Sequence, residues 1–127
     1  MNITRFAKVT FTATPGGNES AALAATTLGA TEVSVIQQRQ SPGGTNPNHF
    51  HDREEIMLQL VGQSVVTVGG TEVVLEPGDT LMIPSATLHS IENRGSLTAE
   101  WLIISRHDVG FFKEDRTKIQ PSWAAQG

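Results

Sequence analysis

Cysteine is absent from this chain of 127 residues. Without thiols the protein can form no disulfide framework, zinc finger, iron–sulfur cluster or thiol nucleophile. The absence also fits a reducing compartment, where disulfides are rare.

Clusters of positive charge and long apolar runs are also missing. The net charge is −4, and the 9 Lys and Arg residues form no basic run that could neutralise nucleic-acid phosphates. No apolar stretch approaches the roughly 20 residues that a membrane span needs, and no signal sequence opens the chain. We therefore expect a cytoplasmic protein that binds neither nucleic acid nor membrane.

The remaining composition is that of an ordinary soluble domain, with 38% apolar and 17% charged residues. A chain of this length can bury a core without disulfides or a structural metal. We expect residues 1–127 to form a single domain.

Short apolar runs alternate with turn residues from position 49 onward. The predicted strands are 49–51, 55–61, 64–68, 71–76, 80–83, 87–92 and 97–105. Gly69-Gly70 suits the tight turn of a hairpin, while Pro77-Gly78 and Pro84 mark further turns. This spacing predicts an all-β sandwich or barrel.

The segments before position 49 are less regular. Residues 3–12 are rich in β-branched and aromatic side chains, which predicts an edge strand. Residues 20–28 suit a strand better than the short helix that Asn18 or Ser20 could cap. Two prolines and two glycines make residues 41–48 a predicted loop.

The richest chemistry lies in three histidines and one acid. His49 and His51 share one face of a strand, about 7 Å apart, so both can reach one ion. Glu55 has the same parity, although Glu54 is an alternative, and His89 would come from a facing strand. Nitrogen and oxygen ligands without sulfur suit Mn, Fe, Co, Ni, Zn or Cu rather than Ca or Mg. The constellation predicts a metal site.

The intervals between these residues resemble the two motifs of the cupin superfamily. The first motif, at residues 43–62, is matched by Gly43, His49, His51, Glu55 and Gly62. The second, at residues 78–93, is matched by Gly78, Pro84, His89 and Asn93. Ala86 stands where the second motif usually has glycine, a departure that affects a turn and not a ligand.

The resemblance implies a cupin-type jelly-roll β-barrel with one divalent transition-metal ion. His49, His51, Glu55 and His89 would be the ligands. The family favours Mn or Fe, with Ni, Zn, Co or Cu as further possibilities. The glycines of the motifs would serve turns, and Asn93 and Asp79 would be structural.

Five other residues are candidates for the substrate pocket. In the strand 32–40 the valines predict an inward face that carries Gln37 and Arg39. Arg39 could clamp a carboxylate, but an arginine at a strand end that reaches solvent fits equally well. Met57 and Gln59 continue the inward parity of Glu55, although Met57 also suits core filling. Trp101 suits either barrel packing or a pocket wall. His107 lies beyond the last core strand, where solvent is the expected neighbour.

Three functional classes fit this site. The first is a dioxygenase-like oxidoreductase on a small oxygenated substrate, with the metal as Lewis acid and Glu55 as general base. The second is a non-redox isomerase, epimerase or lyase. The third is a small-ligand binding or sensing protein without turnover. The first is preferred because the ligand set is complete, although the preference rests largely on fold analogy.

A second copy of the chain is the expected protein partner. The β-rich start can offer an edge strand, and the tail at 106–127 carries aromatic residues that could cover the barrel or reach another subunit. We predict a homodimer. Light scattering that gives the monomer mass at every concentration would refute this.

Overall fold

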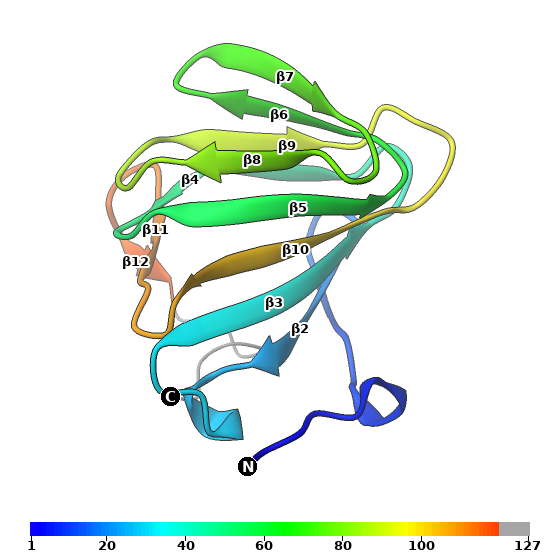
Figure 1. Cartoon of the computed structure of the whole chain (residues 1–127). Helices are drawn as coiled ribbons and strands as arrows, with labels where there is room; N and C mark the ends of the chain where they lie inside the picture. Colours follow the sequence, from blue (N-terminus) through cyan, green and yellow to red (C-terminus); the bar gives the residue numbers. More distant parts are fainter. Residues whose placement is uncertain (120–127) are drawn as a thin grey trace.

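Twelve short strands in two facing sheets form the body of the protein in the computed structural model, which describes residues 1–119 (Figure 1). The sheets have the strand orders β1-β2-β3-β10-β5-β8 and β12-β11-β4-β9-β6-β7, and the strands pair antiparallel. The bounds are β1 Thr12–Thr14, β2 Asn18–Ala24, β3 Val33–Gln40, β4 Thr45–His51, β5 Glu55–Val61, β6 Ser64–Val68, β7 Thr71–Leu75, β8 Thr80–Ile83, β9 His89–Glu92, β10 Ala99–Arg106, β11 Phe111–Lys113 and β12 Lys118–Ile119. The expected all-β jelly-roll fold is confirmed.

The second half of the chain follows the sequence prediction closely. Strands β5, β6 and β8 have the predicted bounds, and β7, β9 and β10 differ from theirs by one or two residues. Gly69 and Gly70 adopt φ of 54° and 86° in the two-residue turn between β6 and β7. Positive φ at both positions matches the right-handed twist of a hairpin, which explains the paired glycines.

The first half departs from the prediction in three places. Residues 3–12 do not form a strand: a 3₁₀ turn, η1 (Phe6–Lys8), precedes the three-residue edge strand β1. The aromatic residues pack outside the sheet, where the ring of Phe11 meets Phe6 edge-on and lies 3.7 Å from the Arg39 guanidinium carbon.

The other two differences concern element ends. The strand β2 stops at Ala24, and a second 3₁₀ turn, η2 (Thr26–Leu28), ends at Gly29 with φ 96°. The predicted loop at 41–48 is half strand, because β4 begins at Thr45 and pairs with β9. No helix within residues 1–119 is long and apolar enough to cross a membrane.

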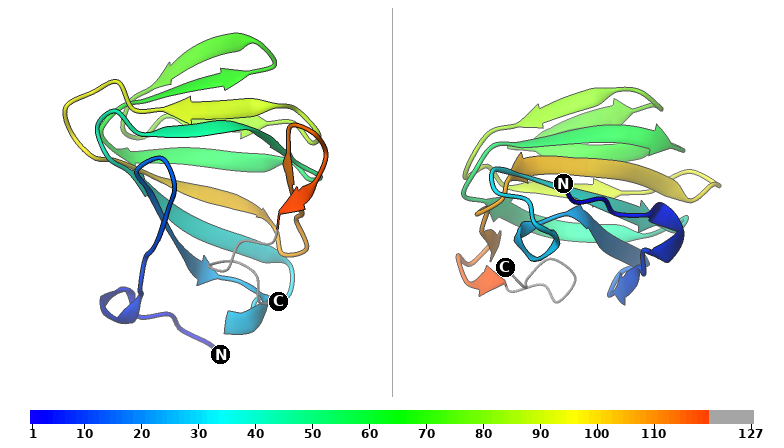
Figure 2. Two further views of the ribbon diagram at one scale, coloured as in Figure 1. Left: turned by 180° about the vertical axis from the view of Figure 1, so that it is seen from behind. Right: turned by 60° about the horizontal axis from the view of Figure 1, so that its bottom comes forward.

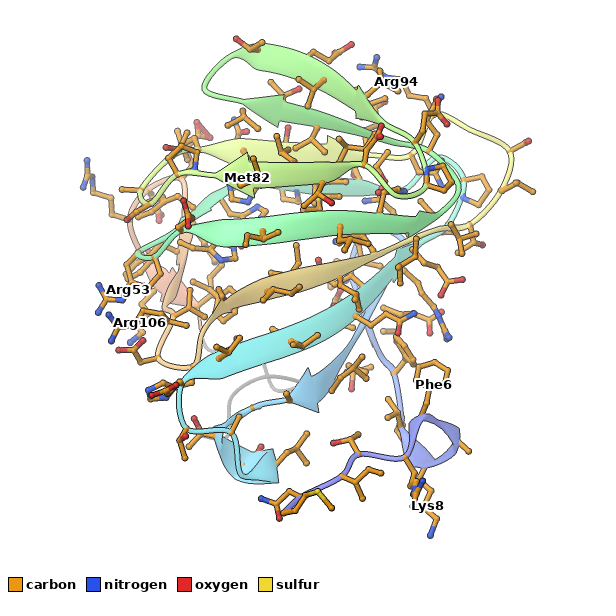
Figure 3. All side chains as sticks on the ribbon, viewed as in Figure 1. Phe6, Lys8, Arg53, Met82, Arg94 and Arg106 are labelled. Atoms are coloured by element: carbon orange, nitrogen blue, oxygen red, sulfur yellow. The ribbon has the colours of Figure 1, made fainter. Side chains whose placement is uncertain are left out.

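The hydrophobic core lies between the sheets. It consists of Ile36, Met57, Val66, Leu75, Ile91, Ala99, Trp101 and Ile103. Outward side chains such as Met82, Phe6 and Lys8 project from the surface (Figure 3). The core residues come from six strands of both sheets, so the core depends on the sheets facing each other.

Asn93 joins three chain segments near one end of the core and is 1% exposed. Its amide donates to the carbonyls of Gln40 and Leu97, and its Oδ1 accepts from the Gly95 backbone. The side chain of Asp79 likewise accepts the backbone N–H of Glu76 in the turn before β8. Both residues have the structural contacts that the motif implied.

Ala86 occupies a conformation that favours glycine. Its φ is 59°, and its backbone N–H donates to the His51 carbonyl at 2.7 Å. A Cβ in this left-handed region meets the following carbonyl, at a cost of roughly 1–2 kcal/mol. The turn that precedes β9 is therefore strained in this chain.

We predict that Ala86→Gly raises the free energy of unfolding by about 0.5–1 kcal/mol, since relief of strain exceeds the extra entropy of glycine in the unfolded chain. Urea denaturation measures the change. Ala13→Gly in strand β1 is the control and should lower stability instead, because its Cβ is not strained. Equal destabilisation by both substitutions would contradict the prediction.

Candidate metal centre

Three histidines from neighbouring strands converge on one point. His49 and His51 lie on β4, and His89 starts β9, where it is the register partner of His49. Alternate residues of a strand share a face, so all three rings point between the sheets. One nitrogen from each lies within 4.8 Å of the others, and the group could hold a metal ion. The sequence spacing predicted this convergence.

Glu55 reaches the histidines from the opposite sheet. It is the first residue of β5 and is 2% exposed. Its Oε2 lies 2.6 Å from His51 Nδ1, and its Oε1 lies 3.0 Å from His89 Nε2. The alternative, Glu54, is exposed to solvent. The structure therefore brings together all four predicted ligands.

Backbone carbonyls orient two of the imidazoles. His49 Nδ1 lies 2.9 Å from the Pro47 carbonyl, and His89 Nδ1 lies 3.0 Å from the Thr87 carbonyl. A carbonyl can only accept, so in each ring Nδ1 carries the proton. In the neutral form Nε2 then keeps its lone pair, as metal coordination requires.

The electrostatics keep the carboxylate ionised. Burial alone would raise the pKa of Glu55, but His51 and His89 outweigh it and hold the pKa well below its usual range. Burial lowers the pKa of His89, but Glu55 outweighs it and raises that pKa. For His49, burial together with His89 and His51 lowers the pKa to about 4. At neutral pH His49 is thus neutral and ready to coordinate.

Several buried polar atoms here make no hydrogen bond among the described residues. They are His51 Nδ1 and Nε2, Glu55 Oε2 and His89 Nε2. His51 Nδ1 and His89 Nε2 nevertheless lie 2.6 and 3.0 Å from the Glu55 carboxylate oxygens, so the polar atoms are gathered in one place. Unpaired buried polar atoms are costly, and a cation bound by them would remove that cost. The donor set fits a transition metal.

His49, His51 and Glu55 form one wall of a cavity of about 650 Å³ between the sheets. This volume is typical of sites that bind drug-sized molecules. The lining residues are Thr14, Pro15, Asn18, Ser20, Ile36, Gln38, Asn46, Pro47, Asn48, His49, His51, Glu55, Ile91, Ile103, Phe111, Lys113, Glu114, Asp115 and Ile119. The interior is mainly apolar, and amides and charged side chains surround the mouth.

The predicted inward face of β3 is wrong. Val33 is 50% exposed, whereas Ile36 on the opposite face is 3% exposed. Gln37 and Arg39 therefore point outward, where both donate to the Glu100 carboxylate, at 3.1 and 2.9 Å. The outer face of this sheet is also aliphatic, so valines did not identify the interior. Ile36 and Gln38 line the cavity in place of Gln37 and Arg39.

The inward orientation of Met57 and Gln59 is confirmed, and both side chains are fully buried. Met57 packs in the hydrophobic core with Trp101. The Gln59 amide donates to the carbonyls of Val61 and Gly62 at the end of its own strand. These three candidates lie in the packed interior and not among the residues that line the 650 Å³ cavity.

A hairpin from the C-terminal segment completes the cavity. β11 pairs with β4 and β12 pairs with β11, which extends the second sheet at its edge, as Figure 2 shows in red and orange beside β4. Phe111 is the register partner of His51 and meets its ring edge-on at 4.7 Å. Lys113 is the partner of His49 and lines the mouth. Sequence reasoning missed both, because no local pattern links them to the motifs.

Polar contacts anchor this hairpin next to the histidines. Asp52 follows His51 directly in the chain, and its carboxylate accepts the backbone N–H of Gly110 at 2.7 Å. Arg53 and Arg106 lie at the same end of the barrel (Figure 3), and both reach Asp108, at 3.5 and 3.1 Å. The exposed His107 contacts Thr26 and takes no part in the site. The predictions for residues 120–127 lie outside the described part of the chain.

The sequence of the chain matches a family model described as "Cupin domain" over residues 37–105. The match begins in β3 and ends in β10, so it includes all four converging side chains.

Individual relatives have diverse names. The chain is 35% identical over 85 residues to tetracenomycin polyketide synthase protein TcmJ of Streptomyces glaucescens, covering 66% of this chain and 57% of that protein. It is 31% identical over 114 residues to an oxalate oxidase of Triticum aestivum, covering 78% of this chain and 50% of that protein. The chain thus spans about half the length of the curated relatives it matches.

A solved structure with a similar fold is the polyketide cyclase RemF from Streptomyces resistomycificus. The TM-score is 0.76 at 23% identity, and the likeness covers 86% of this chain and 81% of that one. At this identity the likeness shows the fold alone.

We predict that His49→Gln makes the metal-free protein less sensitive to acid. The pKa of His49 is about 4 when folded and 6.5 ordinarily, so between these values a proton binds the unfolded chain preferentially. The free energy of unfolding of the wild type therefore falls as the pH drops from 6.5 to 4. Over the same range that of the variant should fall by about 1–2 kcal/mol less. This figure is smaller than the pKa difference alone would give, because the ring is partly exposed to solvent.

Urea denaturation at several pH values, with a chelator present, gives these free energies. The raised pKa of His89 changes stability with pH in the opposite direction, and His89 is present in both wild type and variant. His107→Gln, at an exposed position outside the site, is the matched control for the loss of one imidazole. The same slope in wild type and His49→Gln would show that the prediction is wrong.

Proposed function

This chain belongs to the cupin family, and we propose from that premise that it is a metal-dependent enzyme acting on hydroxy-ketone or dicarbonyl compounds. The observation that carries the proposal is the convergence of three histidines and Glu55 beside a large, mainly apolar cavity that His49, His51 and Glu55 line. The class of reaction is proton transfer next to a carbonyl, as in the cyclisation of polyketide-like compounds.

His49, His51, His89 and Glu55 would hold the metal, with Mn or Fe as the expected ion. When bound, the metal supplies a Lewis acid that polarises substrate oxygens. A metal held by these residues would suit the paired oxygens of a hydroxy-ketone. The name of the polyketide synthase protein noted above supports this substrate class.

Glu55 is the proposed proton acceptor. Its lowered pKa keeps the carboxylate anionic at neutral pH, and the same shift makes it a weak base that relies on a metal to acidify the C–H bond of the substrate. It would remove a proton from the carbon next to the carbonyl, and the electron pair left behind would attack a second carbonyl carbon of the same molecule. The π bond of that carbonyl would break, and its oxygen would take the proton back from Glu55, so that the product is an isomer of the substrate. The apolar walls formed by Ile36, Ile91 and Ile103 would hold the carbon skeleton and exclude water.

A dioxygenase-like reaction is the second candidate. The identity to an oxalate oxidase supports redox chemistry at this type of site. A two-carbon acid would fill only a small part of the 650 Å³ cavity, which favours a larger substrate for this chain.

Removal of a residue that only hydrogen-bonds to a metal ligand typically weakens metal binding by about 10- to 100-fold. We predict that His89→Ala and Glu55→Gln, which each remove a ligand itself, weaken it at least as much. Titration calorimetry with Mn²⁺ and Zn²⁺ measures the affinity, and elemental analysis of the protein purified without added metal identifies the natural ion. His107→Ala, at an exposed histidine away from the site, is the control and should bind normally. Unchanged affinity in both site variants would refute the ligand assignment.

We further predict that the metal-loaded protein catalyses deuterium exchange from D₂O into the methyl group of 2′-hydroxyacetophenone, which carries a hydroxy-ketone oxygen pair and an acidic C–H. Mass spectrometry follows the exchange, and Glu55→Gln should slow it by about 100-fold or more, the upper part of the range for general-base catalysis. An oxygen electrode run with catechols, flavonols and diketones tests the second candidate. No exchange and no oxygen uptake by metal-loaded protein would contradict an enzymatic role.

A further inference from the structure

The Gln38 side chain lines the cavity from the sheet opposite the histidines. It is half-buried on β3, between β2 and β10. Its Oε1 accepts the indole N–H of Trp101 at 2.8 Å, and its Nε2 donates to Ser20 Oγ at 3.1 Å. The amide is therefore held at both ends by residues that are almost fully buried.

These contacts determine which end of the amide faces the cavity. The indole N–H can only donate, so the amide oxygen must turn toward Trp101. Trp101 is 1% exposed and has no room to turn away. The amide nitrogen must then lie toward Ser20, which also lines the cavity. It carries two hydrogens and gives one to Ser20, so the other can be donated to a ligand.

The strand register places this donor far from the metal ligands. Across β3, β10 and β5 the inward residues form three successive rungs. They are Ser34–Ser105–Glu55, Ile36–Ile103–Met57 and Gln38–Trp101–Gln59. Gln38 is thus four residues along the sheet from the rung of Glu55, a distance of about 13 Å. Ile36 and Ile103 line the cavity between the two ends.

We propose that Gln38 is a specificity-determining residue that donates a hydrogen bond to an acceptor oxygen at the far end of the substrate. The substrate class is an elongated apolar ring system with a chelating oxygen pair at one end and an acceptor oxygen roughly 10 Å away. This rests on the proposed function, because the chelating end must meet the metal site. Short dicarboxylic acids cannot span both ends.

Two flavones test the proposal: 3-hydroxyflavone, which has a hydroxy-ketone chelating end, and 3-hydroxy-4′-methoxyflavone, which adds an acceptor oxygen at the distal ring. Fluorescence titration of the metal-loaded protein should give about 5-fold tighter binding of the methoxy compound, the value of one neutral hydrogen bond. In Gln38→Glu the preference should disappear, because a carboxylate still accepts from Trp101 but offers no donor to the methoxy oxygen.

Gln38→Leu is the second variant and should also remove the preference, which is read as the ratio of the two flavone affinities within each variant. Thermal melting and metal titration verify that each variant is folded. An equal preference in wild type and both variants overturns the role of Gln38, as does failure of metal-loaded wild type to bind either flavone.

The metal-free protein separates this inference from the proposed function. Loss of binding to both flavones without metal supports the chelating end, and a methoxy preference that depends on Gln38 supports the distal donor. If both flavones bind equally well with and without metal while the methoxy preference still depends on Gln38, the proposed function fails and the donor role stands.

Discussion

The contact of Glu55 with His51 and His89 is the constraint on which the site depends. These residues come from opposite sheets, and all three are almost fully buried. A buried carboxylate without partners would cost several kcal/mol, so the sheets must face each other with β5 opposite β4 and β9. A bound cation would strengthen this arrangement, since it would satisfy the nitrogen and oxygen atoms that point at one another.

The same arrangement divides the interior into two parts. Around Met57 and Trp101 the sheets pack into a closed core, and between β3 and β4 they leave an open cavity. The hairpin of β11 and β12 closes the side of that cavity, and Phe111 rests on the ring of His51. His49, His51 and Glu55 thus lie where a mainly apolar wall meets the cavity, an arrangement that fits the proposed site for a mainly apolar substrate.

Trp101 shows how the core and the cavity act on each other. Its ring packs among the buried core residues, while its N–H determines the orientation of the Gln38 amide in the cavity wall. A core residue can therefore set the hydrogen-bonding polarity of a binding surface that it does not line. Neighbouring strands in strict register make such coupling direct, because side chains of paired residues share one face.

The sequence by itself determined which four side chains converge and the fold family. His49, His51, Glu55 and His89 are set by spacing within and between short strands, and strand parity is a local property of the backbone. Only the tertiary structure decided which face of β3 is inside. Both faces carry aliphatic residues, and packing against the opposite sheet, not composition, buries Ile36 and exposes Val33. The positions of Gln38, Phe111 and Lys113 likewise follow from strand pairings between segments far apart in the chain, which no local pattern encodes.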